Sequence, residues 1–345
     1  MSKIYLLILF IPFFLFFSFK FSRLIKIYDY PDNKRKIHSK PILLVGGIFF
    51  ELIIIFYYFI ILLLDKFDVI HLYVDSQKDY LILLFTLSLC FFVGIYDDKK
   101  NLNAFFKLII MFIIFFVSLT YLSDIYQIKK LSSFFGYELF LNFYSIFFTS
   151  LCFVILLNAA NMADGINSLS CNTFLIWLFL INFFLPLDNF YFFMNIILII
   201  SLILFSILNY KNKCFLGDGG CFVLVSYISF VTVYTYNLNS TNQIQYLNLE
   251  SIFLLFLIPG IDMLRLFLKR SIRGQNPLKA DKDHLHHIMI AKYGNLKTLI
   301  IYNALTLFPW LIYLVLTSLL PYLIIIVIVI YYLLVSKIKK PYEKN

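Results

Sequence analysis

Long apolar runs constrain this chain more than any other feature of its sequence. A helix needs roughly 20 apolar residues to cross a bilayer, and eleven runs of about that length follow one another with short connections. Composition agrees, because 62% of the residues are hydrophobic and only 14% are charged. We therefore predict an all-α integral membrane protein, a polytopic bundle of ten or eleven transmembrane helices, since the break before Pro321 is weak. The runs are 4–22, 43–64, 80–96, 104–122, 142–158, 171–187, 191–209, 220–237, 250–268, 297–317 and 321–336.

The distribution of Lys and Arg predicts how this bundle is oriented. Most of the 29 Lys and Arg lie in the segments that follow odd-numbered runs and in the tail from residue 337. The opposite loops hold only Lys66, Lys78, Lys129 and Lys130. Because basic residues accumulate in cytoplasmic loops, eleven spans would place the N-terminus outside and the C-terminus in the cytoplasm. The first run lacks an A-x-A-like site and is predicted to be a retained helix.

Repeats, net charge and cysteine spacing indicate no further class of function. No internal repeat and no Gly-, Ser- or Pro-rich linker divides the chain, so residues 1–345 are predicted to form a single domain. The net charge of +10 is explained by the basic loops and their attraction to lipid headgroups and phosphates, and we predict no nucleic-acid partner. The five cysteines show neither disulfide nor C-x-x-C spacing.

A pair of aspartates ends the third apolar run. Asp97 and Asp98 are followed by Lys99 and Lys100. Adjacent carboxylates in a partly apolar setting repel each other, which favours a bound cation or a shared proton. The pair suits metal binding or removal of a proton from a phosphate. The alternative, a solvated acidic helix end, stays open for this motif alone.

A second polar motif ends the fifth run. Asn158, Asn161 and Asp164 follow one another in steps of three, which places them on one helical face, and Gly165 permits a sharp turn before Asn167. Amide and carboxylate oxygens on one face are suitable ligands for a hard cation or a sugar phosphate. A polar cap at the helix C-terminus is the simpler alternative.

A glycine-rich motif precedes the eighth run. Residues 215–220 read Phe-Leu-Gly-Asp-Gly-Gly, with Asp218 near the predicted helix N-terminus. Glycines allow a pyrophosphate to approach the backbone closely. A capping aspartate is a common alternative at such a position.

Three histidines lie in the longest basic segment, 268–296, where a short amphipathic helix is predicted after Pro277. His284, His286 and His287 resemble a metal cluster, but zinc would need further ligands. Because the segment is cationic, we favour the histidines as donors to phosphate or nucleotide, with a solvated loop as the alternative. The first basic loop, 31–41, is predicted to gather anionic lipid or nucleotide, although such loops often only anchor headgroups.

If the predicted orientation is right, these motifs meet at one membrane surface, where carboxylates beside basic loops indicate a divalent cation and a phosphorylated substrate. Taken in order, they resemble the polyprenyl-phosphate N-acetylhexosamine-1-phosphate transferases, the MraY/WecA family (glycosyltransferase family 4). The resemblance extends from about residue 31 to residue 287. The sequence His-Leu-His-His is similar to that of the WecA-like branch, the undecaprenyl-phosphate GlcNAc-1-phosphate transferases.

This resemblance implies an enzyme of the bacterial inner membrane that uses Mg²⁺ or Mn²⁺. Such enzymes transfer N-acetylhexosamine-1-phosphate from a UDP-sugar to undecaprenyl phosphate and release UMP, the first step in building a surface polysaccharide such as the O-antigen. Membrane lipids and a second copy of the chain are the further partners expected. An ion-coupled transporter is the alternative, although the acids cluster at one interface without a repeat. A CDP-alcohol phosphotransferase is a weaker alternative, because Asp164-Gly165 continues as Ile-Asn-Ser-Leu and not as the Asp-Gly-x-x-Ala-Arg of those enzymes. A silent membrane scaffold is the third.

Roles for individual residues also follow from the resemblance. Asp97 and Asp98 match the aspartates that activate the lipid phosphate, and Asp164 is a third catalytic candidate. Asp218 matches the metal-binding aspartate, with Asn158 as a further ligand. Asn167 and Cys221 depart from the family, which often has Asp and Ser there. Substrate-binding residues are expected to be Lys99, Asn161, Asn167, Arg270, Arg273, His284, His286, His287 and, in the first loop beside Asp32, Arg35 and His38.

Overall fold

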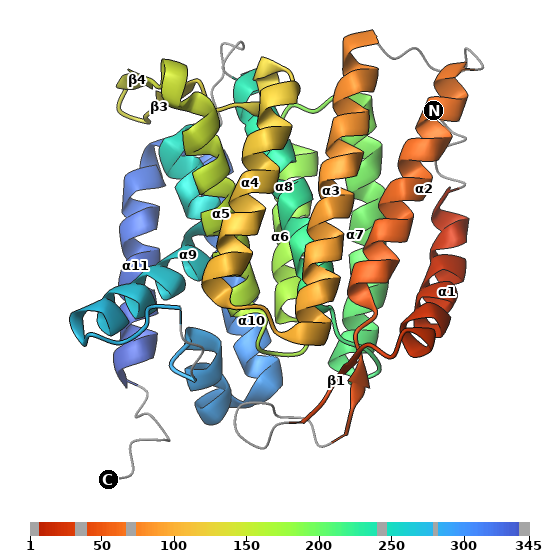
Figure 1. Cartoon of the computed structure of the whole chain (residues 1–345). Helices are drawn as coiled ribbons and strands as arrows, with labels where there is room; N and C mark the ends of the chain where they lie inside the picture. The colour runs from red at the N-terminus through yellow and green to blue at the C-terminus, as the bar shows by residue number, and fades with distance from the viewer. Residues whose placement is uncertain (1–6, 32–39, 67–73, 240–246, 279–281, 338–345) are drawn as a thin grey trace.

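The computed structural model describes residues 7–31, 40–66, 74–239, 247–278 and 282–337 of the chain (Figure 1). Within these ranges the protein is a bundle of α-helices with two short hairpin-like strand pairs. The helices are α1 (Ile11–Leu24), α2 (Gly46–Lys66), α3 (Val74–Lys100), α4 (Ala104–Tyr121), α5 (Ser145–Ala163), α6 (Leu169–Phe184), α7 (Asn189–Tyr210), α8 (Gly217–Asn239), α9 (Leu249–Ile272), α10 (Leu285–Val315) and α11 (Leu320–Lys337). The strands are β1 (Tyr28–Asp29), β2 (Ile42–Leu43), β3 (Lys130–Ser132) and β4 (Glu138–Phe140), and single 3-10 turns are η2 (Asp124–Tyr126), η3 (Asn142–Tyr144) and η4 (Thr317–Leu319).

The predicted fold class, an all-α polytopic bundle, is confirmed. In the described part of the chain, ten helices are long and apolar enough to cross a membrane. The remaining apolar helix, α6, has 16 residues and packs against α7, α8 and α10, so it belongs to the same bundle. Each predicted apolar run corresponds to one helix, and the helix ends differ by several residues from the ends of the runs.

A short helix precedes the tenth span, as the sequence predicts after Pro277. The label α10 covers two helices between Leu285 and Val315, which meet in a kink at Gly294, whose φ of 75° and ψ of 172° are not helical. The predicted run from residue 297 lies in the helix after the kink. The short helix before the kink carries the histidine segment and places it directly at the end of the bundle.

The central helix is α8, which packs against α2, α3, α5 and α6. In its apolar window 83% of the residues are buried, against 22% in α4. A close approach of glycines brings α3 onto α8: a Cβ on Gly94 would lie 2.5 Å from the Cα of Gly219. Since Gly94 lies one helical turn before Asp98, this contact sets the end of α3 against the beginning of α8.

The segment before α2 holds the glycine-rich turn from the other side. β1 and β2 pair in antiparallel fashion, and an isolated bridge joins Leu44 to Phe215. The N–H of Phe215 donates to the carbonyl of Leu43 at 2.9 Å, and the N–H of Val45 donates to the carbonyl of Phe215 at 3.0 Å. Backbone hydrogen bonds therefore fix the chain that leads into α8 to the entry of α2.

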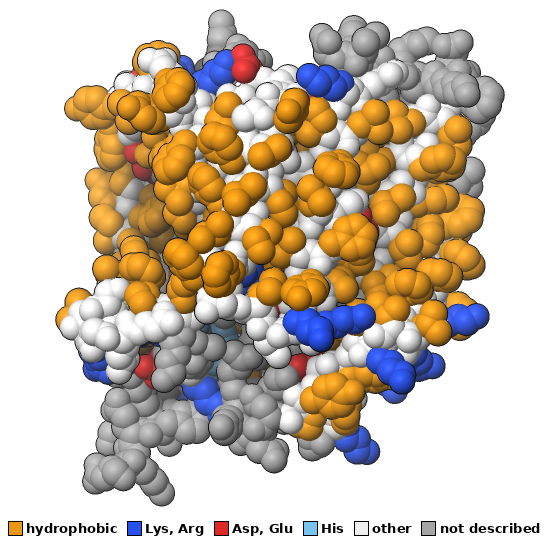
Figure 2. All heavy atoms as spheres, in the orientation of Figure 1, with side chains coloured by type: hydrophobic (Ala, Val, Ile, Leu, Met, Phe, Trp, Pro, Cys, Tyr) orange, Lys and Arg blue, Asp and Glu red, His pale blue; other side chains and the backbone are white. Residues whose placement is uncertain are grey.

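The surface of the bundle divides into an apolar middle and polar ends. Figure 2 shows hydrophobic side chains over the middle of this face, with Lys and Arg side chains at its lower and upper edges. The α3–α4, α5–α6, α7–α8 and α9–α10 connections and the end of α11 all lie at that lower end (Figure 1). The β3–β4 hairpin lies at the upper end. An apolar girdle of this kind fits a multi-pass membrane protein; which end faces the cytoplasm stays a prediction.

Candidate active site

Asp98 joins the end of α3 to the beginning of α8. Its Oδ1 accepts a hydrogen bond from the backbone N–H of Asp218 at 2.8 Å, and its Oδ2 accepts one from Gly219 at 3.1 Å. The first N–H groups of a helix lack partners within the helix and attract negative charge. Gly217 has a φ of +72°, and a Cβ on it would come within 2.7 Å of Asp98 Oδ2. The turn therefore needs a glycine at position 217 to leave room for the Asp98 carboxylate, and the carboxylate accepts the N–H groups that follow the turn.

Asp97 belongs to a cluster of charges beside this junction. Its Oδ2 accepts a hydrogen bond from Lys107 Nζ at 2.6 Å, and its Oδ1 accepts one from the N–H of Leu102 at 2.7 Å. Lys107 Nζ also lies 3.2 Å from Asp218 Oδ2. The side chains of Asp97, Lys107 and Asp218 are 6%, 13% and 29% exposed. One buried ammonium thus lies between two carboxylates, with Asp218 as the member most open to a ligand.

Lys107 is a functional candidate that the sequence analysis missed. It comes from the first turn of α4, inside the apolar run 104–122, where no other charged residue occurs. An ionisable residue inside a membrane span is expensive and usually functional. This rule could have identified Lys107 from the sequence. It could not identify the partners of Lys107, two aspartates that are 10 and 111 residues away in the chain.

Asp164 approaches the same cluster from α5. It is the C-cap residue of α5, and its charge repels that of Asp98. Removal from water raises the pKa of Asp164 to about 6, and the negative charge of Asp29 adds to this rise. The four acids Asp97, Asp98, Asp164 and Asp218 are therefore gathered at one end of the bundle.

The asparagines of the second motif point to neighbouring elements. Asn158 Nδ2 lies 3.2 Å from Met263 Sδ on α9, which leaves its amide oxygen as the atom able to face a cation. Asn161 is half-buried one turn later on α5. Asn167 Nδ2 donates to Asn212 Oδ1 at 2.6 Å, so it ties the α5–α6 turn to the α7–α8 connection. The ligand roles predicted for these three side chains stay predictions.

The histidines lie against the Asp164 turn. His284 is the N-cap residue of α10, and its Nδ1 lies 2.8 Å from Asp262 Oδ2. The rings of His284 and His286 stack at 5.5 Å, and His287 follows at 4.3 Å from His286. A Cβ on Gly165 would lie 2.2 Å from His286 Nε2. The second motif and the histidine segment, 120 residues apart, are therefore in contact.

The remaining basic candidates lie around this end of the bundle. Arg270 is buried, and its Nη1 donates to the carbonyl of Pro277 at 2.7 Å, so it supports the loop after α9. Lys99 and Arg273 are exposed. The first-loop candidates Asp32, Arg35 and His38 lie outside the described residues.

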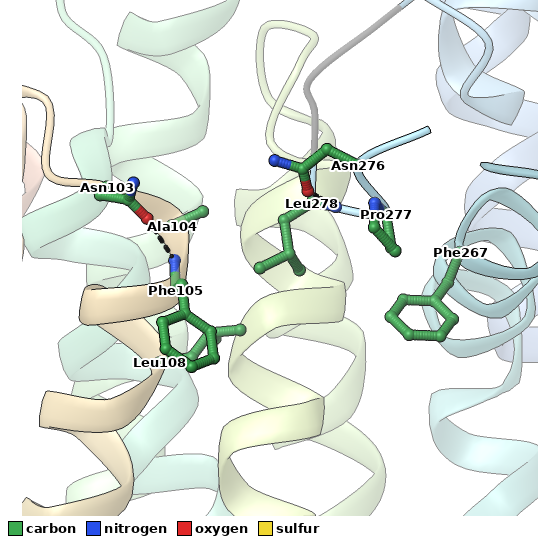
Figure 3. A pocket seen from close by; sticks show the side chains of 8 residues that line it. All are labelled: Asn103, Ala104, Phe105, Leu108, Phe267, Asn276, Pro277 and Leu278. Atoms are coloured by element: carbon green, nitrogen blue, oxygen red, sulfur yellow. Dashed lines mark hydrogen bonds between the residues drawn. The ribbon is translucent and has the colours of Figure 1, made fainter. Parts of the chain in front are cut away.

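A mostly apolar pocket of about 480 Å³ opens between the start of α4 and the loop after α9 (Figure 3). Phe105 and Leu108 come from the same first turns of α4 that carry Lys107, and Phe267 faces them from α9. Asn103 Oδ1 accepts a hydrogen bond from the N–H of Phe105 at 2.9 Å and caps the helix. The lining consists of Asn103, Ala104, Phe105, Leu108, Phe267, Asn276, Pro277 and Leu278.

The donor set fits a hard cation only in part. Across the described ranges, no group of three or more His, Cys, Asp or Glu side chains has the arrangement of a metal site. Asp97 and Asp218 nevertheless flank a positive charge, that of Lys107. Carboxylate oxygens are the ligands that Mg²⁺ and Mn²⁺ prefer. Asp218, the more exposed of these two acids, fits the predicted metal role best.

Comparison with known proteins agrees with this arrangement. The sequence model of glycosyl transferase family 4 matches residues 80–236, which run from α3 into α8 and carry all four acids and Lys107. The undecaprenyl-phosphate alpha-N-acetylglucosaminyl 1-phosphate transferase of Escherichia coli K12 is 26% identical over 303 residues, covering 82% of this chain and 74% of that protein. The protein of the same name from Thermotoga maritima is 25% identical over 287 residues, covering 81% and 79%. The predicted resemblance is thus confirmed: the helices that carry the four acids and Lys107 match the sequence pattern of glycosyl transferase family 4.

Proposed function

We propose that this protein transfers N-acetylhexosamine-1-phosphate, with N-acetylglucosamine as the first candidate sugar, from a UDP-sugar to undecaprenyl phosphate. UMP is released, and the lipid-linked diphosphosugar initiates a surface polysaccharide. The observation that carries the proposal is the cluster of Asp97, Lys107 and Asp218 at the end of the buried helix α8, within the region that matches the family. The relatives named for this reaction are bacterial, which supports a place in the bacterial inner membrane.

The chemistry is an exchange of one phosphorus–oxygen bond for another. An oxygen of the lipid phosphate attacks the sugar-proximal phosphorus of the UDP-sugar, and the bond from that phosphorus to the bridging oxygen breaks. The bridging oxygen and its electron pair leave with UMP. Attacker and target are both anionic, so catalysis depends mainly on positioning and on neutralising charge.

The acids and Lys107 divide these tasks. Asp97 or Asp98 orients the lipid phosphate or accepts its proton. Asp98 accepts backbone N–H groups of α8 with both oxygens, whereas Asp97 contacts Lys107, the cation assigned to the phosphate, so Asp97 is the candidate for direct contact. Lys107, which lies between Asp97 and Asp218, supplies a fixed positive charge to an arriving phosphate. Asp164 is assigned to the donor side, since its turn touches His286.

Asp218 would hold the divalent cation, Mg²⁺ or Mn²⁺, with Asn158 as a further candidate ligand. Such an ion supplies neutralisation of diphosphate charge and alignment of the leaving oxygen. The 29% exposure of the Asp218 side chain supports this role, because the carboxylate can exchange its contact with Lys107 for another cation.

The polyprenyl chain is assigned to the pocket in Figure 3. Its lining is mostly apolar, and it opens beside the α4 turn that carries Lys107. A lipid phosphate bound near Lys107 would then leave its first isoprene units against Phe105, Leu108 and Phe267. The uridine end of the donor is assigned to the histidines, with Arg270, Arg273, Lys99, Asn161 and Asn167 as candidate contacts.

The transporter alternative gains no support from the comparisons. The gathered acids also lie at one end of the bundle, whereas transporters place their sites near the middle of the membrane in broken, repeated helices.

The decisive experiment measures transfer by the purified protein from a panel of labelled UDP-sugars to undecaprenyl phosphate in detergent, with Mg²⁺, with Mn²⁺ and with a chelator. We expect a labelled lipid that depends on the cation, and its loss in Asp218→Asn. Asp124→Asn, a change of an exposed aspartate at the opposite end, is the control. Failure of the wild-type protein with every UDP-HexNAc would refute the proposal.

A further inference from the structure

We propose that Asp262 is a positioning residue of the donor site: it fixes the orientation and tautomer of His284 and couples the histidine cluster, His284, His286 and His287, to α11. The inference rests on the proposed function and adds a part to it. Asp262 was not among the candidates from the sequence. The sequence feature that could have identified Asp262 is an acidic residue within an apolar run, 250–268.

Asp262 is a buried carboxylate that accepts hydrogen bonds from three elements. It is 5% exposed. Its Oδ2 lies 2.8 Å from Nδ1 of His284, and its Oδ1 accepts from the N–H of Leu285 at 3.1 Å. Oδ1 also accepts from Arg265 Nη2 at 2.9 Å and from the hydroxyl of Tyr331 at 2.7 Å. A simple helix cap needs one acceptor for one N–H, so this set of partners exceeds a capping role.

The chemistry of the pair fixes the proton on His284. The guanidinium of Arg265 keeps Asp262 ionised, and an ionised carboxylate can only accept hydrogen bonds. Nδ1 of His284 must therefore carry the hydrogen. Nε2 is on the opposite edge of the ring and is left to face a ligand. The carboxylate thus selects one tautomer and one ring orientation.

The ring of His284 stacks on the ring of His286, so the orientation of His284 affects the position of His286 in the site. His284 and His286 are nearly parallel, with an angle of 11° between their planes. His286 is 1% exposed, and among the described residues its Nε2 has no hydrogen-bond partner. A buried polar atom without a partner is costly. That nitrogen lies against Gly165, next to Asp164. It is therefore our candidate for a hydrogen bond with the bound UDP-sugar.

The other side of Asp262 reaches the last helix. Tyr331 on α11 is fully buried, and its hydroxyl accepts from Arg265 Nε at 2.5 Å while donating to Asp262. Arg265 Nη2 also donates to the carbonyl of Asp283, immediately before the histidines. Helix α11 is thereby made a support of the donor site, although it lies outside the region that matches the family model.

The test compares Asp262→Asn with Asp79→Asn, another buried aspartate, which accepts a hydrogen bond from the N–H of Ser123 at 3.0 Å at the opposite end of the bundle. We expect Asp262→Asn to raise KM for the UDP-sugar about tenfold or more, the size of effect that follows loss of the carboxylate that orients a functional histidine. KM for undecaprenyl phosphate should stay within about twofold. Asp79→Asn should leave both constants unchanged.

A spectroscopic measurement tests the positioning directly and needs no activity. In protein labelled with ¹⁵N-histidine, the His284 signal, assigned by its loss in His284→Gln, should show Nδ1–H in the wild type. It should change tautomer or broaden in Asp262→Asn and, more mildly, in Tyr331→Phe, which serves if Asp262→Asn does not fold. An active wild type with an unchanged KM and an unchanged His284 signal in both variants would overturn the inference. An inactive wild type would instead refute the proposed function.

Discussion

At the scale of single residues, the electrostatics of the site depend on Lys107. Two carboxylates and one ammonium share a poorly solvated space, where charges interact much more strongly than in water. Without the ammonium, Asp97 and Asp218 would repel each other and any phosphate. The same ammonium is attractive to the lipid phosphate, so its place between the acids serves both the resting and the substrate-bound site.

Replacement of Lys107 separates charge from geometry. Lys107→Met should lower kcat about 100-fold or more, since the loss of one preorganised charged donor has that order of effect. Lys107→Arg keeps the charge and should retain part of the activity. The measurement is initial transfer rate, with melting temperature in detergent as a check on folding. Equal activity of Lys107→Met and wild type would exclude a catalytic role for this ammonium.

The pKa of Asp164, raised to about 6, predicts a pH dependence. If the ionised form acts, kcat/KM should fall about tenfold per pH unit below pH 6 and level off above it. The folded protein holds this proton between pH 3.8 and about 6 while the unfolded chain has lost it. The contribution of Asp164 to stability therefore falls as pH rises through that window and stays lower above it.

Infrared difference spectra provide the direct measurement of this group. A protonated carboxyl band should disappear with a midpoint near pH 6 in the wild type and be absent from Asp164→Asn. A midpoint near 4 would show that burial does not hold the proton on Asp164, and the predicted activity profile would lose its basis.

The residues found only in the structure share a physical reason. Sequence patterns identified Asp97, Asp98 and Asp218 because each lies beside glycines or charges at the end of an apolar run. Lys107 and Asp262 are charges inside such runs, and their roles depend on partners that are distant in sequence, Asp218 for Lys107 and His284 for Asp262. Patterns along one chain segment carry no information on which distant segment faces it.

At the scale of elements, the junction of α3 and α8 determines the site. Gly94 allows the helices to approach, Gly217 allows the turn, and Asp98 caps α8 with two hydrogen bonds. A displaced α3 would carry Asp97 and Asp98 away from Asp218 together. The site therefore depends on backbone contact as much as on acidic side chains.

A pair of glycine substitutions tests this junction. Gly94→Ala should destabilise the protein and abolish most activity, because its Cβ would meet backbone atoms of Gly219 at 2.5 Å. Gly260→Ala in α9 is the control: a Cβ there has no neighbour within 4 Å, and alanine favours a helix by about 0.5–1 kcal/mol. Melting temperature and transfer rate in detergent are the readouts. A Gly94→Ala protein as stable and active as Gly260→Ala would show that the helices can separate without harm.

The helices themselves were largely predictable, because a membrane-spanning helix requires a long apolar run. Long apolar runs report helices directly, so each run corresponds to a helix. Their ends were less predictable, because α3 continues through polar residues to Lys100, beyond the end of its apolar run. The pairing of Leu44 with Phe215, which holds the glycine turn, had no signal at all, since two isolated residues show no strand pattern.

At the scale of the whole molecule, an apolar girdle separates two unlike ends (Figure 2). One end gathers the acids, the histidines and the loops rich in Lys and Arg. The other carries the β3–β4 hairpin, with exposed aromatic side chains such as Tyr137. Aromatic residues favour the membrane interface, and basic loops favour the cytoplasm. Since aromatic residues occur at both interfaces, the basic loops alone set the direction, and they predict that the site end faces the cytoplasm, where nucleotide sugars are made.

Cysteine labelling tests that orientation. Of the native cysteines, Cys90, Cys171, Cys214 and Cys221 are buried and Cys152 is half-buried, so background reaction with an impermeant maleimide should be low. A cysteine at Tyr137, in the β3–β4 hairpin, should react in spheroplasts, and one at Lys211, in the exposed α7–α8 connection, only after lysis. The reverse pattern would place the gathered acids outside the cell, away from a UDP-sugar supply, and no transferase using that donor could then work from this site.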